Sequence, residues 1–341
     1  MATPTMLRSA IALLAAGIAA GPALANDTTA ELANGGLLFV HNDNVEMRSE
    51  DLAISAKEVS VRYRFFNTSD KDVTVLVAFP MPEIRVEEPD LNLAVPTEDP
   101  VNFLAFTTKV NGTPVKTEVE QRVTAAGIDR TQLLRTLGIP LAPHLQATAD
   151  ALNGLPKDKW DDLIRIGLAE IEEYDVGKGV QKHLAARWGL STTFYWEQTF
   201  AAKAETVVEH RYQPSVGESV LTELGSPAAA KEPWYEEYKQ KYCFDREFLA
   251  AVARARPPGR SQAGARYSEQ RIDYVLRTGA NWSGPIKEFR LVIDKGDPDN
   301  LVSFCGERPR RISPTQHEIK LSDFTPDGDV SVLILKKLPA R

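Results

Sequence analysis

The sequence predicts a mainly β protein of the β-sandwich type, with two β-rich units and a helical insertion in the first of them. Apolar and polar residues alternate over many short segments, as in strands that bury one face. Clusters of Gly, Asn, Asp and Pro separate these segments and are typical of turns between strands. Helical spacing of apolar residues replaces this alternation over one long stretch, residues 127–189, which we interpret as the insertion.

The chain opens with a segment typical of a cleaved export signal. Arg8 precedes an apolar run over residues 10–20, and Ala23-Leu24-Ala25 then supplies an Ala-x-Ala cleavage motif. The run is shorter than the ~20 apolar residues that span a bilayer, which disfavours an uncleaved anchor helix. We therefore expect residues 1–25 to be a signal peptide. The mature chain would be periplasmic, start at Asn26 and contain no transmembrane segment.

The N-terminal unit, residues 26–225, is predicted to be a β-sandwich organised around residues 57–83. Val59, Val61, Tyr63 and Phe65 alternate with polar residues, and residues 73–79 alternate in the same way. The polar connector between the two runs favours an antiparallel hairpin, which Pro80 and Pro82 would end. We also expect strands over residues 37–40 and 45–54, a hairpin at Asn111-Gly112, and a strand pair over residues 192–200 and 205–212.

Within the insertion, apolar residues at helical spacing predict helices over residues 128–137 and 157–173, with a third over 178–188. The insertion is also a candidate docking element for a partner. The second unit, residues 226–341, should begin with short helices over 234–242 and 245–255. Strands follow them in the last third of the chain, at residues 272–276, 289–293, 300–304, 316–321 and 330–334.

The chain has two cysteines, Cys243 and Cys305, and in an oxidising compartment an even pair most simply forms one disulfide. That bond would close a loop of about sixty residues, which the chain-entropy model converts to about 4 kcal/mol of stabilisation. Two buried free thiols are the alternative. A catalytic or metal-binding pair is disfavoured, because there is no CxxC spacing and no histidine lies close to either cysteine.

The sequence contains no common catalytic motif: GxSxG, HExxH, Walker A, GxGxxG and SxxK are all missing. The net charge of −7 gives no reason to expect nucleic-acid binding. The five histidines are scattered, so we predict no metal site and no cofactor. Three polar clusters, at residues 42–46, 297–300 and 327–329, have oxygen ligands that suit Ca²⁺, but these residue types are also ordinary turn formers.

Aromatic residues are the remaining candidates for a site. Trp196, Trp234 and Trp282 stand in aromatic-rich or turn-like segments and could face a sugar, a peptide or a protein partner. Core packing is the competing explanation for Trp196, and packing of a surface helix is the competing explanation for Trp234. Trp282 lies in a turn-like segment, where packing explains a large aromatic residue less easily.

Five segments carry a family resemblance and together cover nearly the whole of the expected mature chain: residues 27–36, 45–57, 61–82, 196–214 and 274–289. They resemble a family of uncharacterised exported bacterial proteins, the domain of unknown function 4424. This resemblance implies a periplasmic protein with a cysteine pair at Cys243 and Cys305, and it implies no catalytic residues. Asn67, the Phe79-Pro80-Met81-Pro82 strand end and the Asn111-Gly112 turn are also similar in pattern to the VIT module of inter-alpha-trypsin inhibitor heavy chains, a structural or binding β-sandwich.

We therefore expect a periplasmic, non-enzymatic binding or structural module for a protein or another envelope component. The alternative is a hydrolase acting on envelope substrates, with an acidic site assembled from carboxylates that lie far apart in the sequence. Two carboxyl groups about 5–10 Å apart in one concave pocket, with a perturbed pKa, would favour the hydrolase.

Overall fold

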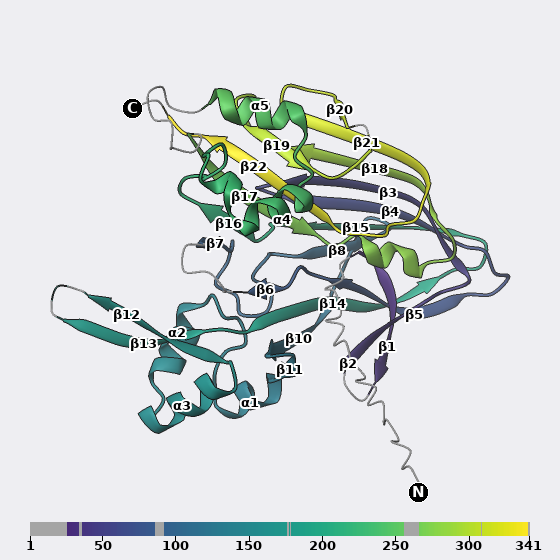
Figure 1. Ribbon diagram of the computed structural model, residues 1–341. Helices are drawn as coiled ribbons and strands as arrows, with labels where there is room; N and C mark the ends of the chain where they lie inside the picture. The colour runs from purple at the N-terminus through teal and green to yellow at the C-terminus, as the bar shows by residue number, and fades with distance from the viewer. Residues whose placement is uncertain are drawn as a thin grey trace, which may run out of the picture.

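The computed structural model describes residues 26–33, 36–85, 92–175, 177, 179–255, 266–307 and 309–339, and it confirms a mainly β protein with a small helical insertion (Figure 1). The predicted signal peptide, residues 1–25, lies outside these residues. Within the described chain, 22 strands form four sheets of eight, seven, five and two strands.

The eight-stranded sheet, called the central sheet below, has one buried face and one solvated face. In its strand β4 (Val59–Asn67), Val61 and Tyr63 are buried, whereas Arg62 points to the other face. There Arg62 pairs with Glu209 of the next strand at 2.7 Å. The strand order is β20 (Arg310–Arg311), β21 (Gln316–Phe324), β18 (Ile286–Asp294), β3 (Val45–Ser55), β4, β15 (Glu205–Tyr212), β8 (Thr107–Val110) and β9 (Thr113–Val115).

The seven-stranded sheet packs against part of the buried face of the central sheet. Phe79 and Trp196 of this sheet both contact His210 of β15, with ring centroids 4.8 and 5.4 Å away. The strand order is β11 (Ile128–Asp129), β10 (Glu118–Ala125), β14 (Gly189–Phe200), β5 (Val73–Pro80), β1 (Thr28–Ala33) and β2 (Gly36–Val40), and β6 (Ile84–Arg85) also pairs with β14.

The predicted hairpin over residues 57–83 is wrong, although both of its strands exist. β4 lies in the central sheet and β5 in the seven-stranded sheet, so the connector crosses from one layer to the other. β14 and β15, the second predicted pair, are divided in the same way. The two crossings bind each other, because the Asn67 side chain donates a hydrogen bond of 2.9 Å to the Phe200 carbonyl. Alternation suits two strands that pack face to face as well as two that pair edge to edge, so the pattern could not distinguish them.

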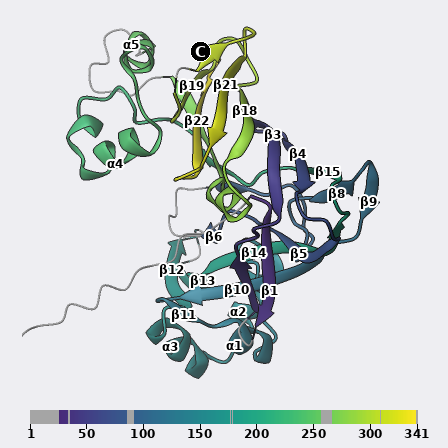
Figure 2. The same cartoon turned by 90° about the vertical axis from the view of Figure 1, so that its right-hand side faces the viewer.

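The five-stranded sheet lies between the rest of the buried face of the central sheet and two helices, α4 (Pro233–Lys241) and α5 (Arg246–Arg254), which Figures 1 and 2 show on its outer side. Val332 and Ile334 face the main core, whereas Leu333 and Leu335 pack with Phe248 of α5. The strand order is β19 (Leu301–Phe304), β22 (Val330–Lys337), β17 (Tyr267–Tyr274), β16 (Val216–Ser219) and β7 (Asn92–Ala94).

The described residues of the insertion form three short helices, one β-hairpin and the two-residue strand β11. The helices are α1 (Thr131–Thr136), α2 (Gln146–Asn153) and α3 (Lys157–Arg165). The predicted helix over 157–173 ends early, because Gly167 has a φ of +75°, a left-handed conformation that commonly terminates helices. The chain then forms β12 (Ala169–Asp175) and β13 (Val180–Ala186), so the helix predicted over 178–188 is wrong.

Strands from the two predicted units share the central sheet. β18 pairs in parallel with β3, with residues 288–294 aligned beside residues 49–55. The division of the chain at residue 225 into two β-rich units stays a prediction.

Candidate binding cleft and a buried polar centre

A pocket of about 550 Å³ lies between helix α4 and the segment that follows β5, and we call it the α4 cleft. Residues 82–85 line one side, just beyond the Phe79-Pro80-Met81-Pro82 strand end. Helix α4 contributes Trp234, Tyr238 and Lys241 on the other side, and β17 contributes Arg271 and Asp273.

Helix α4 is positioned by its aromatic face. Pro233 stands at the start of the helix, where its missing N–H removes no helical hydrogen bond. Tyr238 stacks edge-on against Tyr242 at 4.7 Å and donates a hydrogen bond of 2.7 Å to the buried carboxylate of Glu269 in β17. Trp234 keeps 36% of its surface exposed and lies in the wall of the cleft.

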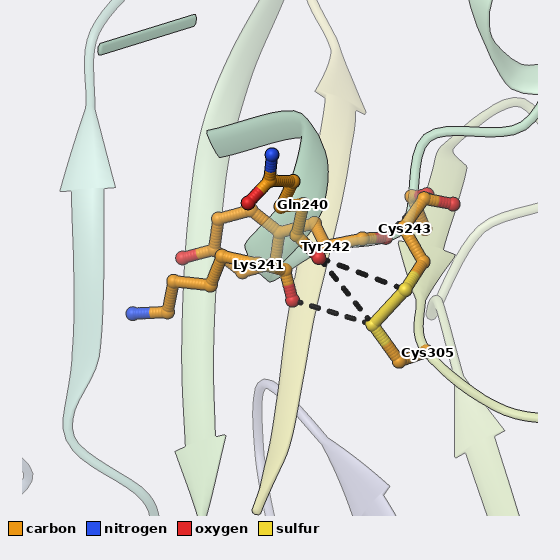
Figure 3. Close-up of a disulfide and its surroundings, with 6 residues drawn as sticks. Gln240, Lys241, Tyr242, Cys243 and Cys305 are labelled. Atoms are coloured by element: carbon orange, nitrogen blue, oxygen red, sulfur yellow. Dashed lines mark hydrogen bonds between the residues drawn. A yellow bond between two sulfur atoms is a disulfide. The ribbon is translucent and has the colours of Figure 1, made fainter. Parts of the chain in front are cut away.

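The predicted disulfide between Cys243 and Cys305 is present (Figure 3). It joins the chain just after α4 to the chain just after β19. Both sulfur atoms lie 3.6 Å from the Gln240 carbonyl oxygen, and Ser303 donates a hydrogen bond of 2.8 Å to the Tyr242 carbonyl. One wall of the α4 cleft is thus covalently tied to the five-stranded sheet.

The α4 cleft carries acidic and basic side chains in equal number, three of each. Glu83 pairs with Arg85 at 2.9 Å, and Asp273 pairs with Lys241 at 3.3 Å. Arg271 differs, because its Nε is buried and has no hydrogen-bond partner among the described residues. The side chain of Arg271 still lines the cleft together with aromatic rings, and such a set suits an anionic group joined to a flat or apolar one.

The structure places the three candidate tryptophans differently. Trp282 has no exposed surface, its indole N–H donates a hydrogen bond of 2.7 Å to the Asp27 carbonyl, and its ring lies 4.5 Å from that of Phe65. Trp196 is also buried and packs on His210. Core packing therefore accounts for both rings, and the prediction of a ligand-facing aromatic residue now concerns Trp234.

A cluster of polar side chains, which we call the buried polar centre, lies where the three large sheets meet. Asn26 and Asp27 come from the chain before β1 in the seven-stranded sheet. The other members are Glu50 of β3, Tyr63 of β4 and His210 of β15 in the central sheet, and Tyr274 of β17 in the five-stranded sheet. Each of the six has at most 1% of its surface exposed.

Hydrogen bonds connect the buried polar centre. The Asp27 carboxylate lies 2.9 Å from Nε2 of His210. The Asn26 side chain donates a hydrogen bond of 3.1 Å to Glu50 and accepts one from the Tyr63 hydroxyl. The hydroxyls of Tyr63 and Tyr274 are 3.1 Å apart, which extends the network to the third sheet.

Burial shifts the protonation of the two acids in this centre. Burial raises the pKa of Glu50 from 4.5 to about 8, and the hydrogen bond from Asn26 opposes this shift. Burial also raises the pKa of Asp27, and the neighbouring His210 opposes it. Both carboxyls thus resist ionisation unless a positive charge lies close to them.

Sequence reasoning missed Glu50 because of a β-bulge. Strand β3 buries Val45 and Met47, and strict alternation would continue with Ser49. The register shifts between Met47 and Ser49, so Glu50 and then Leu52 face the core instead. No feature of the sequence marks this extra residue.

The observation that would favour a hydrolase is not met by the carboxyls described so far. Asp27 and Glu50 have raised pKa values, but neither has exposed surface. In the α4 cleft, Glu83 and Asp273 are already paired with cations.

The three clusters considered for calcium are used in turns and loops. Asn42 caps its own turn by accepting hydrogen bonds from the backbone N–H groups of residues 44 and 45, and Asp297 accepts one from residue 299. The Asp329 carboxylate accepts one from the Leu276 backbone. Among the described residues, no group of three or more His, Cys, Asp or Glu side chains is arranged to hold a metal ion. In the same part of the chain, every helix is too short or too polar to cross a membrane.

Comparisons with known proteins place the chain in a family. A search of curated proteins gave no match. A solved structure described as a "putative nutrient binding protein" from Legionella pneumophila subsp. pneumophila str. Philadelphia 1 aligns over 92% of this chain and 70% of its own, with a TM-score of 0.40 and 15% identity. The sequence model of the family Domain of unknown function (DUF4424) matches residues 25–333, so the chain belongs to that family.

Proposed function

We propose that this chain is an exported, periplasmic binding protein, and that the α4 cleft binds a ligand of the cell envelope. The ligand would carry an anionic group beside a flat or apolar group. One observation carries the proposal: the exposed ring of Trp234 and the cationic side chain of Arg271 line the same open cleft.

The size and rigidity of the cleft support this function. Its volume of about 550 Å³ lies inside the range of small-molecule sites, roughly 300–1,000 Å³. The disulfide and the hydrogen bond from Tyr238 to Glu269 hold helix α4 in place before a ligand arrives. A preformed site loses less entropy on binding than one that must first be ordered.

Two features support export. Ala23-Leu24-Ala25 follows an apolar run of signal-peptide length, and the disulfide between Cys243 and Cys305 belongs to the kind that persists in oxidising compartments.

Photo-crosslinking in the periplasm tests the proposal. A photoreactive residue replaces Trp234 in one protein and Ile128 in another, since Ile128 is 52% exposed and lies on the insertion. We expect a recurrent adduct from position 234, which mass spectrometry identifies as a small molecule, a lipid-linked group or a peptide. An adduct from position 128 alone would refute the α4 cleft and favour docking through the insertion.

Binding of the identified ligand then tests the two groups separately. Trp234→Ala and Arg271→Gln should each weaken binding about tenfold or more, because each removes one of the two contacts that define the cleft. Val220→Ala is the matched control, since Val220 is 81% exposed and does not line the cleft. Unchanged affinity in both cleft variants would contradict the proposed site.

A further inference from the structure

We propose that cleavage after Ala25 creates a new N-terminal ammonium group on Asn26, and that the buried polar centre binds this group as the counter-ion of Glu50 and Asp27. The inference rests on the proposed export, because a leader peptidase must make the cut. It is independent of what the α4 cleft binds.

The other polar atoms of Asn26 are already engaged. Its side-chain nitrogen donates to Glu50 and to the Leu276 carbonyl, at 3.1 and 3.2 Å. Its side-chain oxygen accepts from the Asp27 N–H at 2.9 Å and from the Tyr63 hydroxyl. Its backbone carbonyl accepts from a threonine hydroxyl of the 3₁₀ helix over residues 277–281 at 2.8 Å. Among the described residues no hydrogen bond is recorded for the backbone nitrogen of Asn26, and cleavage would change this atom.

Two buried oxygen atoms of this centre have no well-formed hydrogen bond among the described residues: Oδ2 of Asp27 and Oε1 of Glu50, although the nearby Tyr274 hydroxyl also acts to lower the pKa of Glu50. Leaving a buried acceptor unpaired is costly, and an ionised one costs still more. An ammonium has three N–H donors and no acceptor, so it suits two carboxylate oxygens, whereas a backbone amide has a single N–H.

The charges and distances agree with this assignment. Two acids and one histidine face each other here, and His210 can balance only one of the two carboxylates. The Asn26 side chain lies 3.1 Å from Glu50, so standard bond lengths keep the Asn26 backbone nitrogen within about 8 Å of that carboxylate. Because both residues are buried, an ammonium that comes within about 4–6 Å of the carboxylate favours its ionised form.

The covalent step is hydrolysis of the Ala25–Asn26 amide. Water supplies the hydroxyl of the new Ala25 carboxyl and a hydrogen to the Asn26 nitrogen, and the amine takes up a further proton from solution. A free α-amino group has a pKa of about 8, so most of it is charged at neutral pH even before it meets the carboxylates. Before cleavage the same nitrogen is an uncharged amide.

Close packing leaves little freedom to the first mature residue. A Cβ added to Gly279 would lie 2.5 Å from the side-chain nitrogen of Asn26, so a larger residue at position 279 would collide with Asn26. The three sheets that meet at the centre therefore pack around the residue that would become the N-terminus after leader removal.

Chemical labelling of the full mature protein tests the inference directly. The protein is exported with its own leader, and the mass of its N-terminal peptide shows where it starts. It is then acetylated at pH 7.5, folded and in urea. We expect a chain that starts at Asn26, with α-amine acetylation at least about 100-fold slower in the folded state, because the group is buried and paired. Lys57, which is exposed, is the control and should differ little between the two states. Equal rates at the α-amine would overturn the proposal.

A second measurement separates ion pairing from packing. Chains that start at Asn26 are compared with chains that retain Ala25 with its α-amine acetylated, so that no charged amine is present there, in the wild-type and Glu50→Gln backgrounds at pH 7. Retaining Ala25 should lower the folding equilibrium constant about tenfold or more in the wild type and much less in the Glu50→Gln background. Equal losses would assign the effect to packing and overturn the ion pair. If Glu50→Gln does not fold, the labelling rates decide.

Failure of this inference is distinguishable from failure of the α4 cleft. A periplasmic chain that keeps its leader, or starts at another residue, overturns the processing step and leaves the crosslinking result at Trp234 untouched. A missing adduct at Trp234, conversely, leaves the protection of the Asn26 amine untouched.

Discussion

Retaining an Nα-acetylated Ala25 before Asn26 should make this protein less stable as the pH rises from about 5 to 8. The nitrogen of Asn26 is then an uncharged amide, and burial holds the pKa of Glu50 at about 8 instead of 4.5. Between these two values the folded state keeps a proton that the unfolded state has released, so stability decreases with increasing pH. The contribution of Glu50 to the free energy of unfolding is fully present below pH 4.5 and is lost as the pH rises through about 8.

The size of this effect follows from the pKa difference. A shift from 4.5 to about 8 is about 3.5 units, and at 1.36 kcal/mol per unit it corresponds to about 5 kcal/mol. Burial raises the pKa of Asp27 as well, which adds to the loss of stability as the pH rises. Burial also raises the pKa values of Tyr63 and Tyr274 well above 10, so both hydroxyls stay neutral throughout this range. His210, the remaining neighbour, is common to all the chains compared.

Urea unfolding followed by tryptophan fluorescence at pH 5, 6, 7 and 8 measures the slope. The chain with Ala25 retained should lose stability steadily, its Glu50→Gln variant should lose much less, and the chain that starts at Asn26 should lie between them. Glu318→Gln is the control, because Arg290 and Arg310 lower the pKa of Glu318 to about 2. A lowered pKa gives stability that is lost only below about pH 4.5, so this variant keeps the wild-type slope. Equal stability of the Ala25-retaining chain at pH 5 and pH 8 would refute the reasoning.

Three further predictions concern packing and the disulfide. Trp282→Phe should lower the free energy of unfolding by about 1–3 kcal/mol more than Trp160→Phe, because only Trp282 donates its indole N–H to a buried carbonyl, and Trp160 has no such partner among the described residues. Reducing the bond between Cys243 and Cys305, which are 62 residues apart, should remove about 4 kcal/mol of stability in denaturant titrations, and equal midpoints with and without reductant would contradict this. Gly279→Ala should lower the melting temperature by several degrees, since the added methyl would collide with the side chain of Asn26, and an unchanged melting temperature would show that this side chain can move aside.

The positions of most strands could be predicted from the sequence, but their partners could not. Alternation located β4 and β5 within a residue or two, although only β4 has one buried face throughout and the second half of β5 is buried on both faces. Pairing depends on which layer the chain enters after each connector, and the crossing after Asn67 is fixed by contacts with residues about 130 positions away. The parallel pairing of β18 with β3 is equally remote. The local periodicity of a sequence does not show which strands pair when they lie that far apart along the chain.

The candidate sites could likewise be predicted only in part: some of their features follow from local sequence, and others depend on the packing of distant strands. Helix α4 and the disulfide follow from local spacing and from the count of cysteines. The α4 cleft requires residues 82–85 to meet Arg271, which only the packing of two sheets achieves. Glu50 was hidden by the bulge in β3, which reverses the face predicted by alternation.

Both features that we assign to function would be completed only after export. In a reducing compartment, with the leader attached, the chain has neither the disulfide that anchors helix α4 nor the ammonium that pairs with Glu50 and Asp27. The two lie in different parts of the fold, one at the outer helices and one where three sheets meet, so their losses should add. Together they amount to a large part of the 5–15 kcal/mol that usually stabilises a domain. The precursor is therefore expected to be markedly less stable than the mature protein, as the proposed export of an unfolded chain would require.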